Sequence, residues 1–205
     1  MVRIEAFGEL SVVREAERAV LAPPEAPQLR ALLTLLACHG TSGVSRTRAA
    51  GLLKPEGVDE SEWWATITAL IRRWLGDAHV TVTNDHVALR AALSTSDVEE
   101  FTRAVASGDL ERAVQLHHDR LVDGHHHREA PAFERWLQLQ RERLASEAFS
   151  ACERLAEEAS RRGEPMAAVR WWRQLATQQP LNQRIAASLM EALVAAGDRE
   201  GAVRH

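Results

Sequence analysis

The feature that most constrains the fold is a short signature that recurs in the second half of the chain. The segment GEPMAA at residues 163–168 recurs 34 residues later as GDREGA at residues 197–202. A third copy, GDLERA at residues 108–113, lies 55 residues before the first of these. A regular period of this length predicts pairs of helices that stack on their neighbours. The irregular first interval predicts longer helices or an insert there.

The signature has a simple physical basis. Its Gly lets the chain leave one helix with a positive φ angle. The acidic residue that follows, Glu164 or Asp198, is expected to cap the next helix, and the Ala residues let two helices approach closely. Apolar periodicity predicts helices over residues 132–161 and 165–178, and a further helix before Gly197. The 34-residue period is that of tetratricopeptide repeats.

The C-terminal end of the chain falls inside a predicted repeat. His205 lies midway through the helix that Gly197 and Asp198 begin. Because a half-repeat would be left unpacked, we expect these residues to be part of a longer protein, truncated at this end.

Two adjacent tryptophans lie in the predicted helix over residues 165–178. Trp172 falls on the apolar stripe of that helix, so we expect it in the core. Trp171 is expected at a surface or a repeat interface, where a large amphipathic side chain can contact a partner.

The first ninety residues have a different pattern, with short alternating strands around three helices. The predicted elements are strands at 2–6, 9–12 and 19–21, helices at 26–38, 45–53 and 60–75, and a hairpin at 80–89 with its turn at Asn84 and Asp85. This order is that of a winged helix-turn-helix with an N-terminal sheet. The predicted fold is therefore an α+β winged helix-turn-helix over residues 1–92, followed by an all-α tetratricopeptide-like repeat domain over residues 93–205.

The charge balance limits how the chain can bind nucleic acid. Its net charge is −4, and residues 1–90 carry ten Lys and Arg against eleven Asp and Glu. Phosphate neutralisation supplies most non-specific affinity, so any contact with DNA must come from a few well-placed arginines. Neither a membrane span nor a signal peptide is predicted. The two cysteines, Cys38 and Cys152, are expected to be free thiols in a reducing cytoplasm.

Seven polar residues are candidates for contact with double-stranded DNA. They are Arg46, Arg48, Thr66, Arg72, Arg73, Asn84 and His86. The first two begin a helix, where cationic side chains suit phosphates. The next three lie on the following helix, which would enter the major groove, and the last two at the hairpin tip. Glu62 on that helix would repel phosphate, so a helix used for packing or protein contact is the alternative.

The histidines do not predict a metal site. His117 and His118 are adjacent on a predicted helix, and residues 125–127 are consecutive in a loop, so their side chains diverge. Zinc sites need three or four converging ligands. We therefore expect polar loop and helix-end residues and no metal or other cofactor. The chain has no Gly-rich phosphate loop, nucleophile elbow or paired carboxylates, so an enzyme is not expected.

Several segments together carry a family resemblance. They are FGEL at 7–10, LLTLLA at 32–37, VSR at 44–46, IRRWLG at 71–76, LVDG at 121–124, FERWL at 133–137, RERL at 141–144, PLN at 180–182, LMEAL at 189–193 and AGD at 196–198. Jointly they resemble the bacterial transcriptional activator domain family, which includes the Streptomyces antibiotic regulatory proteins. The resemblance implies an OmpR-like winged helix that binds DNA, and repeats that support a homodimer and contact RNA polymerase or a C-terminal module.

The sequence thus predicts a cytoplasmic, DNA-binding transcriptional regulator. In this hypothesis the winged helix contacts DNA and the repeats mediate dimer, polymerase or effector-domain contacts. The alternative is a degenerate winged helix that serves, with the repeats, as a protein-interaction scaffold without DNA binding. The apolar character of the third helix favours that alternative.

Overall fold

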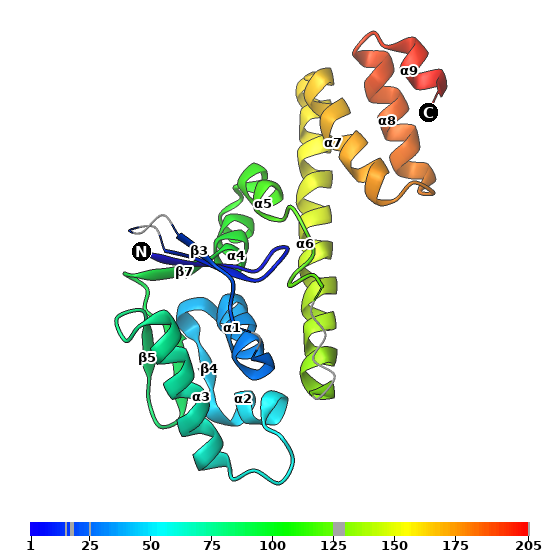
Figure 1. Cartoon of the computed structure of the whole chain (residues 1–205). Helices are drawn as coiled ribbons and strands as arrows, with labels where there is room; N and C mark the ends of the chain where they lie inside the picture. Colours follow the sequence, from blue (N-terminus) through cyan, green and yellow to red (C-terminus); the bar gives the residue numbers. More distant parts are fainter. Residues whose placement is uncertain (15, 17–18, 25, 125–129, 205) are drawn as a thin grey trace. The chain divides into compact units, whose positions relative to one another are not determined.

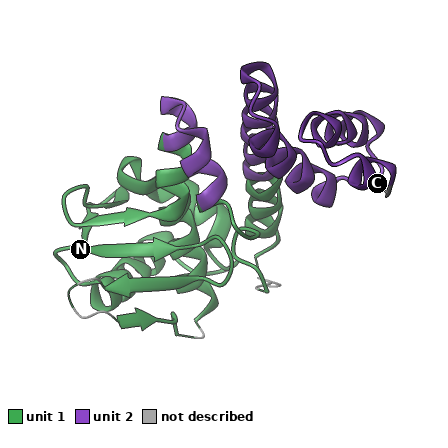
Figure 2. Ribbon diagram, turned by 90° about the horizontal axis from the view of Figure 1, so that it is seen from above, with its two compact units in different colours: residues 1–103, 116–143 green, residues 104–115, 144–205 purple. Residues whose placement is uncertain are grey.

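The chain divides into two compact units. The computed structural model describes residues 1–14, 16, 19–24, 26–124 and 130–204. Unit 1 comprises residues 1–103 and 116–143, and unit 2 comprises residues 104–115 and 144–205 (Figure 1; Figure 2). The division passes through helices α4 (Asp97–Ser107) and α6 (Pro131–Arg162). The functional boundary predicted after residue 92 is not tested by this division and stays a prediction.

The N-terminal sheet of unit 1 has four short strands. Their order is β3 (Ala19–Leu21), β2 (Ser11–Arg14), β1 (Val2–Glu5) and β7 (Ser94–Ser96). β1 and β2 pair antiparallel, as their alternating patterns predict, with Ile4 opposite Val12. β1 also pairs in parallel with β7. β7 is missing from the predicted elements because its three polar residues give no apolar alternation.

Three helices follow, at nearly the predicted positions. They are α1 (Pro27–His39), α2 (Arg46–Leu53) and α3 (Glu60–Leu75), with a short 3-10 turn, η1 (Gly40–Ser42), after α1. Ser45 caps α2 by accepting a hydrogen bond from the backbone N–H of Arg48. Asp59 caps α3 in the same way through two N–H groups. α3 ends at Gly76, whose φ of 93° suits glycine.

A second sheet supplies the wing of the helix-turn-helix. Its order is β4 (Val44–Ser45), β6 (His86–Leu89) and β5 (Val80–Val82), and both pairings are antiparallel. The hairpin of β5 and β6 was expected from its alternation, whereas β4 is only two residues long and has no sequence signal of its own. β4 directly precedes α2, so its pairing with β6 connects the start of α2 to the wing.

Helix α1 forms the centre of unit 1. Every residue from 31 to 37 is buried, including Thr34, whose hydroxyl donates to the backbone carbonyl of Arg30 at 2.9 Å. A helix that is buried on all sides must be covered by other elements. α1 therefore acts as the support on which α2 and α3 are held.

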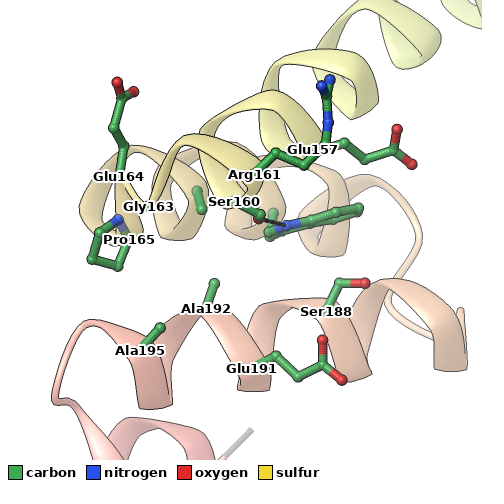
Figure 3. A pocket seen from close by; sticks show the side chains of 12 residues that line it. Glu157, Ser160, Arg161, Gly163, Glu164, Pro165, Ser188, Glu191, Ala192 and Ala195 are labelled. Atoms are coloured by element: carbon green, nitrogen blue, oxygen red, sulfur yellow. Dashed lines mark hydrogen bonds between the residues drawn. The ribbon is translucent and has the colours of Figure 1, made fainter.

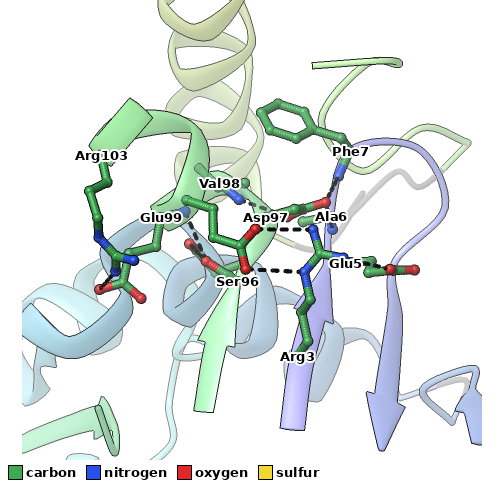
Figure 4. A network of polar contacts seen from close by, with 11 residues as sticks. Arg3, Glu5, Ala6, Phe7, Ser96, Asp97, Val98, Glu99 and Arg103 are labelled. Atoms are coloured by element: carbon green, nitrogen blue, oxygen red, sulfur yellow. Dashed lines mark hydrogen bonds and ion pairs between the residues drawn. The ribbon is translucent and has the colours of Figure 1, made fainter. Parts of the chain in front are cut away.

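The start of α4 is fixed to the N-terminal sheet by a buried carboxylate (Figure 4). Asp97 is 2% exposed, and its Oδ2 accepts hydrogen bonds from the backbone N–H groups of Ala6 at 2.8 Å and Phe7 at 2.9 Å. Its Oδ1 accepts the N–H of Val98 at 2.8 Å. Burial raises the pKa of Asp97, and the three N–H donors, which favour the carboxylate, offset part of that rise.

Other polar contacts around Asp97 connect the same elements. The hydroxyl of Ser96, which is fully buried, donates to the carbonyl of Ala37 at 2.6 Å and so joins β7 to α1. Arg3 on β1 pairs with Glu100 on α4, with Nε 3.3 Å from Oε1. Figure 4 shows Arg3, Ser96 and Asp97 gathered where β1, β7 and α4 meet.

A second buried charged residue holds residues 116–143 in unit 1. Arg141 on α6 is 8% exposed and donates to the carbonyls of Leu121 at 2.8 Å and Val122 at 2.5 Å. Val122 has a φ of 47°, which is costly for a β-branched residue. Leu121 also forms a β-bridge with Phe7. The guanidinium of Arg141 therefore stabilises a strained turn beside the first sheet.

Unit 2 contains the helix pair that the repeat period predicts. It consists of the end of α4, α5 (Leu110–Leu116) except its last residue, the second part of α6, α7 (Pro165–Gln178), α8 (Gln183–Ala195) and α9 (Arg199–Arg204). The 32-residue α6 accounts for most of the irregular first interval, as expected from its length. Neither α6 nor another described helix is long and apolar enough to cross a membrane.

The repeat signature behaves as its residue types predict, with one exception. Gly108, Gly163 and Gly197 all have positive φ angles, between 69° and 85°. Asp109 and Asp198 cap the helices that follow them. The prediction that Glu164 caps α7 is wrong, because its side chain makes no capping hydrogen bond. Glu is longer than the preferred capping residues, and Pro at the first helical position begins α7 instead.

Both tryptophans of α7 lie in the core of unit 2. Trp172 is buried, as predicted. Trp171 is only 4% exposed, so its predicted surface position is wrong. The Arg170 guanidinium lies 4.1 Å from the Trp171 ring centroid, and the Cys152 thiol approaches the Trp171 carbonyl at 3.6 Å. Because the core cluster draws on α6, α7 and α8 together, more than one face of α7 is covered.

Asp97→Ala is expected to destabilise unit 1 by about 3 kcal/mol, since the backbone N–H groups of Ala6 and Phe7 would stay buried without acceptors. Urea unfolding followed by circular dichroism measures this change. Glu100→Gln is the matched control: it removes a partly exposed ion pair and should cost less than about 1 kcal/mol. Equal effects of the two changes would contradict the role given to Asp97.

Candidate nucleic-acid interface

The outward face of α3 carries small and polar residues. The buried residues of α3 are Trp63, Trp64, Ile67, Thr68, Ile71 and Leu75. Glu62, Thr66, Ala69 and Arg73 recur every three or four residues on the exposed side and form one stripe. Leu70 lies outside the core at 41% exposure. The stripe therefore has an acidic residue, Glu62, at its N-terminal end and a basic residue, Arg73, at its C-terminal end. Short side chains lie between them.

The two arginines of α3 have different surroundings. Arg73 is exposed, and within the described residues it makes neither a hydrogen bond nor an ion pair. Arg72 is held against the wing: its Nη2 donates to the Val82 carbonyl at 3.3 Å, and its Nε lies 3.6 Å from Oδ1 of Asp77. The hydroxyl of Thr66 donates back to the Glu62 carbonyl at 2.9 Å. Arg73 is thus the freer of the two cations.

The two arginines of α2 differ in the same way. Arg46 donates from Nε to Oε1 of Glu60 at 2.9 Å and from Nη2 to the Ser61 hydroxyl at 2.9 Å. It therefore links the start of α2 to the start of α3. Arg48 is exposed, and its guanidinium has no hydrogen bond or ion pair in the part of the chain that the structure describes.

Acidic residues surround the N-terminus of α3. Asp59, Glu60 and Glu62 lie within four positions of one another. The backbone N–H of Glu62, followed by that of Ser61, lowers the pKa of Asp59, and Arg46 and Lys54 act in the same direction. Asp59 is therefore ionised near neutral pH. Negative charge at this end stabilises the helix but repels phosphate.

The wing is attached to both helices of the motif. The Trp64 indole Nε1 donates to the Thr83 carbonyl at 3.2 Å, which connects α3 to the wing turn. The backbone N–H of Arg46 donates to the Asp85 carbonyl at 2.6 Å, which connects α2 to the same turn. Asn84 is exposed at the tip.

His86 flanks the hairpin tip, where its carbonyl accepts the backbone N–H of Thr83 at 2.8 Å, but its side chain contacts another loop. It is the first residue of β6, and its Nε2 lies 3.0 Å from the Ser42 carbonyl. The ring is half-buried, because β4 brings the loop before α2 alongside β6. A contact between His86 and DNA stays a prediction. The Nε2 atom of His86 already contacts the Ser42 carbonyl.

Trp64 contacts the wing, but it is not among the candidate residues that the sequence predicts. Periodicity assigns Trp64 to the core stripe, and it is 4% exposed. A buried indole N–H needs an acceptor, which is the one signal in the sequence that points to such a contact. Which acceptor it finds depends on the fold, because Thr83 lies 19 positions further along the chain.

The histidines that the structure describes are used in packing. α5 ends at Leu116, so His117 and His118 lie beyond it, and their predicted position on a helix is wrong. The ring of His117 lies 4.8 Å from that of Phe7, and burial lowers its pKa. Residues 125–127 lie outside the described residues. Among those described, no group of three His, Cys, Asp or Glu side chains is arranged to hold a metal ion.

Both cysteines are free thiols. Burial raises the pKa of Cys38 to about 12 and that of Cys152 to about 11. Both are therefore protonated and poorly nucleophilic near neutral pH. These thiols contribute to packing, and neither takes part in the surface that carries the candidate residues.

Comparison with known proteins gives one family and one fold. Residues 79–205 match the model of a family described as the bacterial transcriptional activator domain. No curated protein matches the chain. A solved structure described as Mycobacterium tuberculosis EmbR in complex with a low affinity phosphopeptide is similar, with a TM-score of 0.64 and 16% identity. The match covers 98% of this chain and 56% of that one, so this chain spans little more than half of its length. At this identity the likeness shows the fold alone.

Trp64→Phe is expected to loosen the wing, because it removes the hydrogen bond to the Thr83 carbonyl while keeping an aromatic ring. The free energy of unfolding should fall by about 1 kcal/mol. The amide of Thr83, which is bonded to the His86 carbonyl, should exchange faster with deuterium.

Trp63→Phe is the matched control for this change. It removes a similar bond, from Trp63 Nε1 to Oε1 of Gln28, but on the side of α1. It should leave exchange at Thr83 unchanged. Equal exchange at Thr83 in both variants would show that Trp64 does not hold the wing.

Proposed function

Because the chain belongs to the bacterial transcriptional activator domain family, we propose that it is a DNA-binding transcriptional regulator. In this proposal residues 1–92 bind double-stranded DNA, and the repeats of residues 93–205 bind protein partners. A DNA partner in a bacterium implies a cytoplasmic location, and the proposal assigns no catalytic role to the chain.

The observation that carries the proposal is the pair of exposed arginines on the helix-turn-helix. Arg48 on α2 and Arg73 on α3 have no ion-pair partner among the described residues, whereas Arg46 donates to Glu60 and Ser61. An exposed guanidinium without a partner is available for phosphate or for a guanine edge. We therefore assign the main contacts with DNA to Arg48 and Arg73.

The stripe on α3 favours insertion into the major groove. Thr66 and Ala69 are short, so they allow the helix axis to approach the bases, and a Thr methyl or Ala can contact a thymine methyl. Arg73, at the C-terminal end of the stripe, is long enough to donate two hydrogen bonds to a guanine base. Asn84 at the wing tip is proposed to contact the backbone of the neighbouring groove.

In this proposal Arg46, Arg72 and His86 act mainly through contacts within the protein. Arg46 orders the acidic start of α3, and Arg72 ties α3 to the wing. The guanidiniums of Arg46 and Arg72 keep N–H donors that these contacts do not use, but their present partners hold them in place. Their removal should therefore affect DNA binding through the geometry of the motif as well as through charge.

The acidic residues near α3 predict weak electrostatic attraction to DNA. Among the described residues of α2 and α3, Arg48 and Arg73 are the exposed cations without an ion pair, and Glu60 and Glu62 oppose them. The logarithm of the binding constant of one chain should fall with the logarithm of salt concentration with a slope of about −2 at most, since each neutralised phosphate contributes about −0.9. Affinity would then depend on base contacts and on a second copy of the chain more than on bulk charge.

The repeats are proposed to provide the second copy, or a contact with RNA polymerase. A palindromic site read by a dimer doubles the number of contacts without adding charge to either chain. Helical repeats suit this role because stacked helices offer an extended surface for partners.

A scaffold without DNA binding is the second candidate, and a specific observation favours it. The start of α3 carries three acidic residues, and Leu70 is exposed on the same helix. An acidic helix with an exposed aliphatic residue suits a protein partner better than a phosphate backbone. Retention of RNA polymerase without retention of DNA would support this candidate.

Arg48→Ala and Arg73→Ala should each weaken binding to the DNA upstream of the protein's own gene. Each change is expected to cost about 1 to 3 kcal/mol if it removes a base contact, or to reduce the salt slope by about 1 if it removes a phosphate contact. Fluorescence anisotropy over a salt series measures both quantities. Arg103→Ala, which removes an exposed arginine on α4, is the control and should change neither.

Glu62→Gln should act in the opposite direction. It removes a negative charge from the exposed stripe of α3 and keeps the length of the side chain. Affinity for the same DNA should therefore rise severalfold at low salt and less at high salt. Wild-type protein that shows no salt-dependent binding to this DNA would overturn the DNA-binding proposal.

A further inference from the structure

Unit 2 contains an open groove that the DNA-binding proposal does not use (Figure 3). It has a volume of about 660 Å³ and lies between the last turns of α6, the first half of α7, and α8. Small residues leave it open: Ser160 and Gly163 on the side of α6, and Ser188 and Ala195 on α8. Its size is that of pockets that enclose a few side chains of a ligand.

The floor of this groove is apolar and ordered. Trp172, Ala168 and Ala192 line it, and each is less than 9% exposed. The Trp172 indole Nε1 donates to the hydroxyl of Ser160 at 3.4 Å, and that hydroxyl donates to the Ala156 carbonyl at 2.9 Å. The indole N–H is thus already satisfied, so the ring offers an apolar surface. An apolar side chain is the natural occupant of this floor.

The rim of the groove is acidic. Glu157, Glu164 and Glu191 line it together with one cation, Arg161. Among the described residues, none of these four side chains has an ion pair or a hydrogen bond. In the view of Figure 3 the carboxylates of Glu157 and Glu191 lie toward one end of the groove, and that of Glu164 lies toward the other.

We propose that this groove binds a basic peptide segment of a partner protein, with one apolar side chain on the Trp172 floor and Lys or Arg side chains against Glu157 and Glu191. Charge complementarity selects this occupant, because three carboxylates outnumber one guanidinium around an apolar floor. An acidic or phosphorylated peptide would meet the opposite charge. The inference deepens the proposed partner-binding role of the repeats and does not depend on DNA binding.

The first experiment uses an array of random short peptides and the full chain. Bound peptides should be enriched in Lys and Arg and should contain an aliphatic or aromatic residue. Two derivatives of a bound peptide then separate the two contributions: Gln in place of the basic residues, and Ser in place of the apolar residue. Both should bind at least about tenfold more weakly. No enrichment, or enrichment of acidic peptides, would overturn the proposal.

Three variants locate the binding in the groove. Glu157→Gln combined with Glu191→Gln should weaken the selected peptide about tenfold at low salt, and much less at high salt. Ala195→Trp should abolish binding by filling the groove, and since Ala195 is exposed, the fold should persist in a circular-dichroism melt. Glu111→Gln on α5 removes an exposed carboxylate outside the groove and should leave the affinity unchanged.

Parallel anisotropy with the upstream DNA distinguishes this inference from the proposed function. If Ala195→Trp still binds the peptide, the groove is not the binding site, even where DNA binding is intact. Peptide binding that responds to the groove variants supports the inference, even where the wild type does not bind DNA.

Discussion

The winged helix depends on one buried carboxylate that holds together two distant parts of the chain. Asp97 accepts three backbone N–H groups, and two of these donors lie about ninety positions earlier, at Ala6 and Phe7. A charge in such a place is favourable only when its hydrogen bonds are complete. Ser96, next to it, binds the Ala37 carbonyl, so the same junction also positions α1. Because α1 supports α2 and α3, the geometry of the helix-turn-helix follows from this junction.

The charges on the helix-turn-helix divide into those that build the motif and those that remain available. Arg46 joins the starts of α2 and α3 through Glu60, and Arg72 joins α3 to the wing. Both guanidiniums satisfy partners within the protein, which lowers their value for an external phosphate. Arg48 and Arg73 are exposed and have no such partner among the described residues. A surface with few free cations relies on shape and base contacts for its affinity, and such binding is only weakly sensitive to salt.

Local signals predict the elements well, and they do not predict which elements meet. Ser45 before an apolar run marks the start of α2, and the 34-residue period marks the pair α7 and α8. β7 cannot be predicted in this way, because its residues are polar, and Ser96 is buried with a hydrogen bond to a distant element. The candidate arginines are identified correctly as residues of α2 and α3. That Arg46 is neutralised by Glu60, fourteen positions away, follows from the turn between the helices and has no signal in the sequence.

The small residues of α7 and α8 connect the fold of unit 2 to its groove. Where small residues are buried, as at Ala168 and Ala192, they let α7 and α8 approach each other. Where they line the open side, as at Ser188 and Ala195, the same short side chains leave a space that no other residue fills. The three carboxylates around this space, Glu157, Glu164 and Glu191, are exposed and have no ion-pair partner among the described residues. An apolar side chain of a ligand can fill this space while neighbouring Lys or Arg side chains pair with the carboxylates, so a basic peptide suits this groove better than a neutral one.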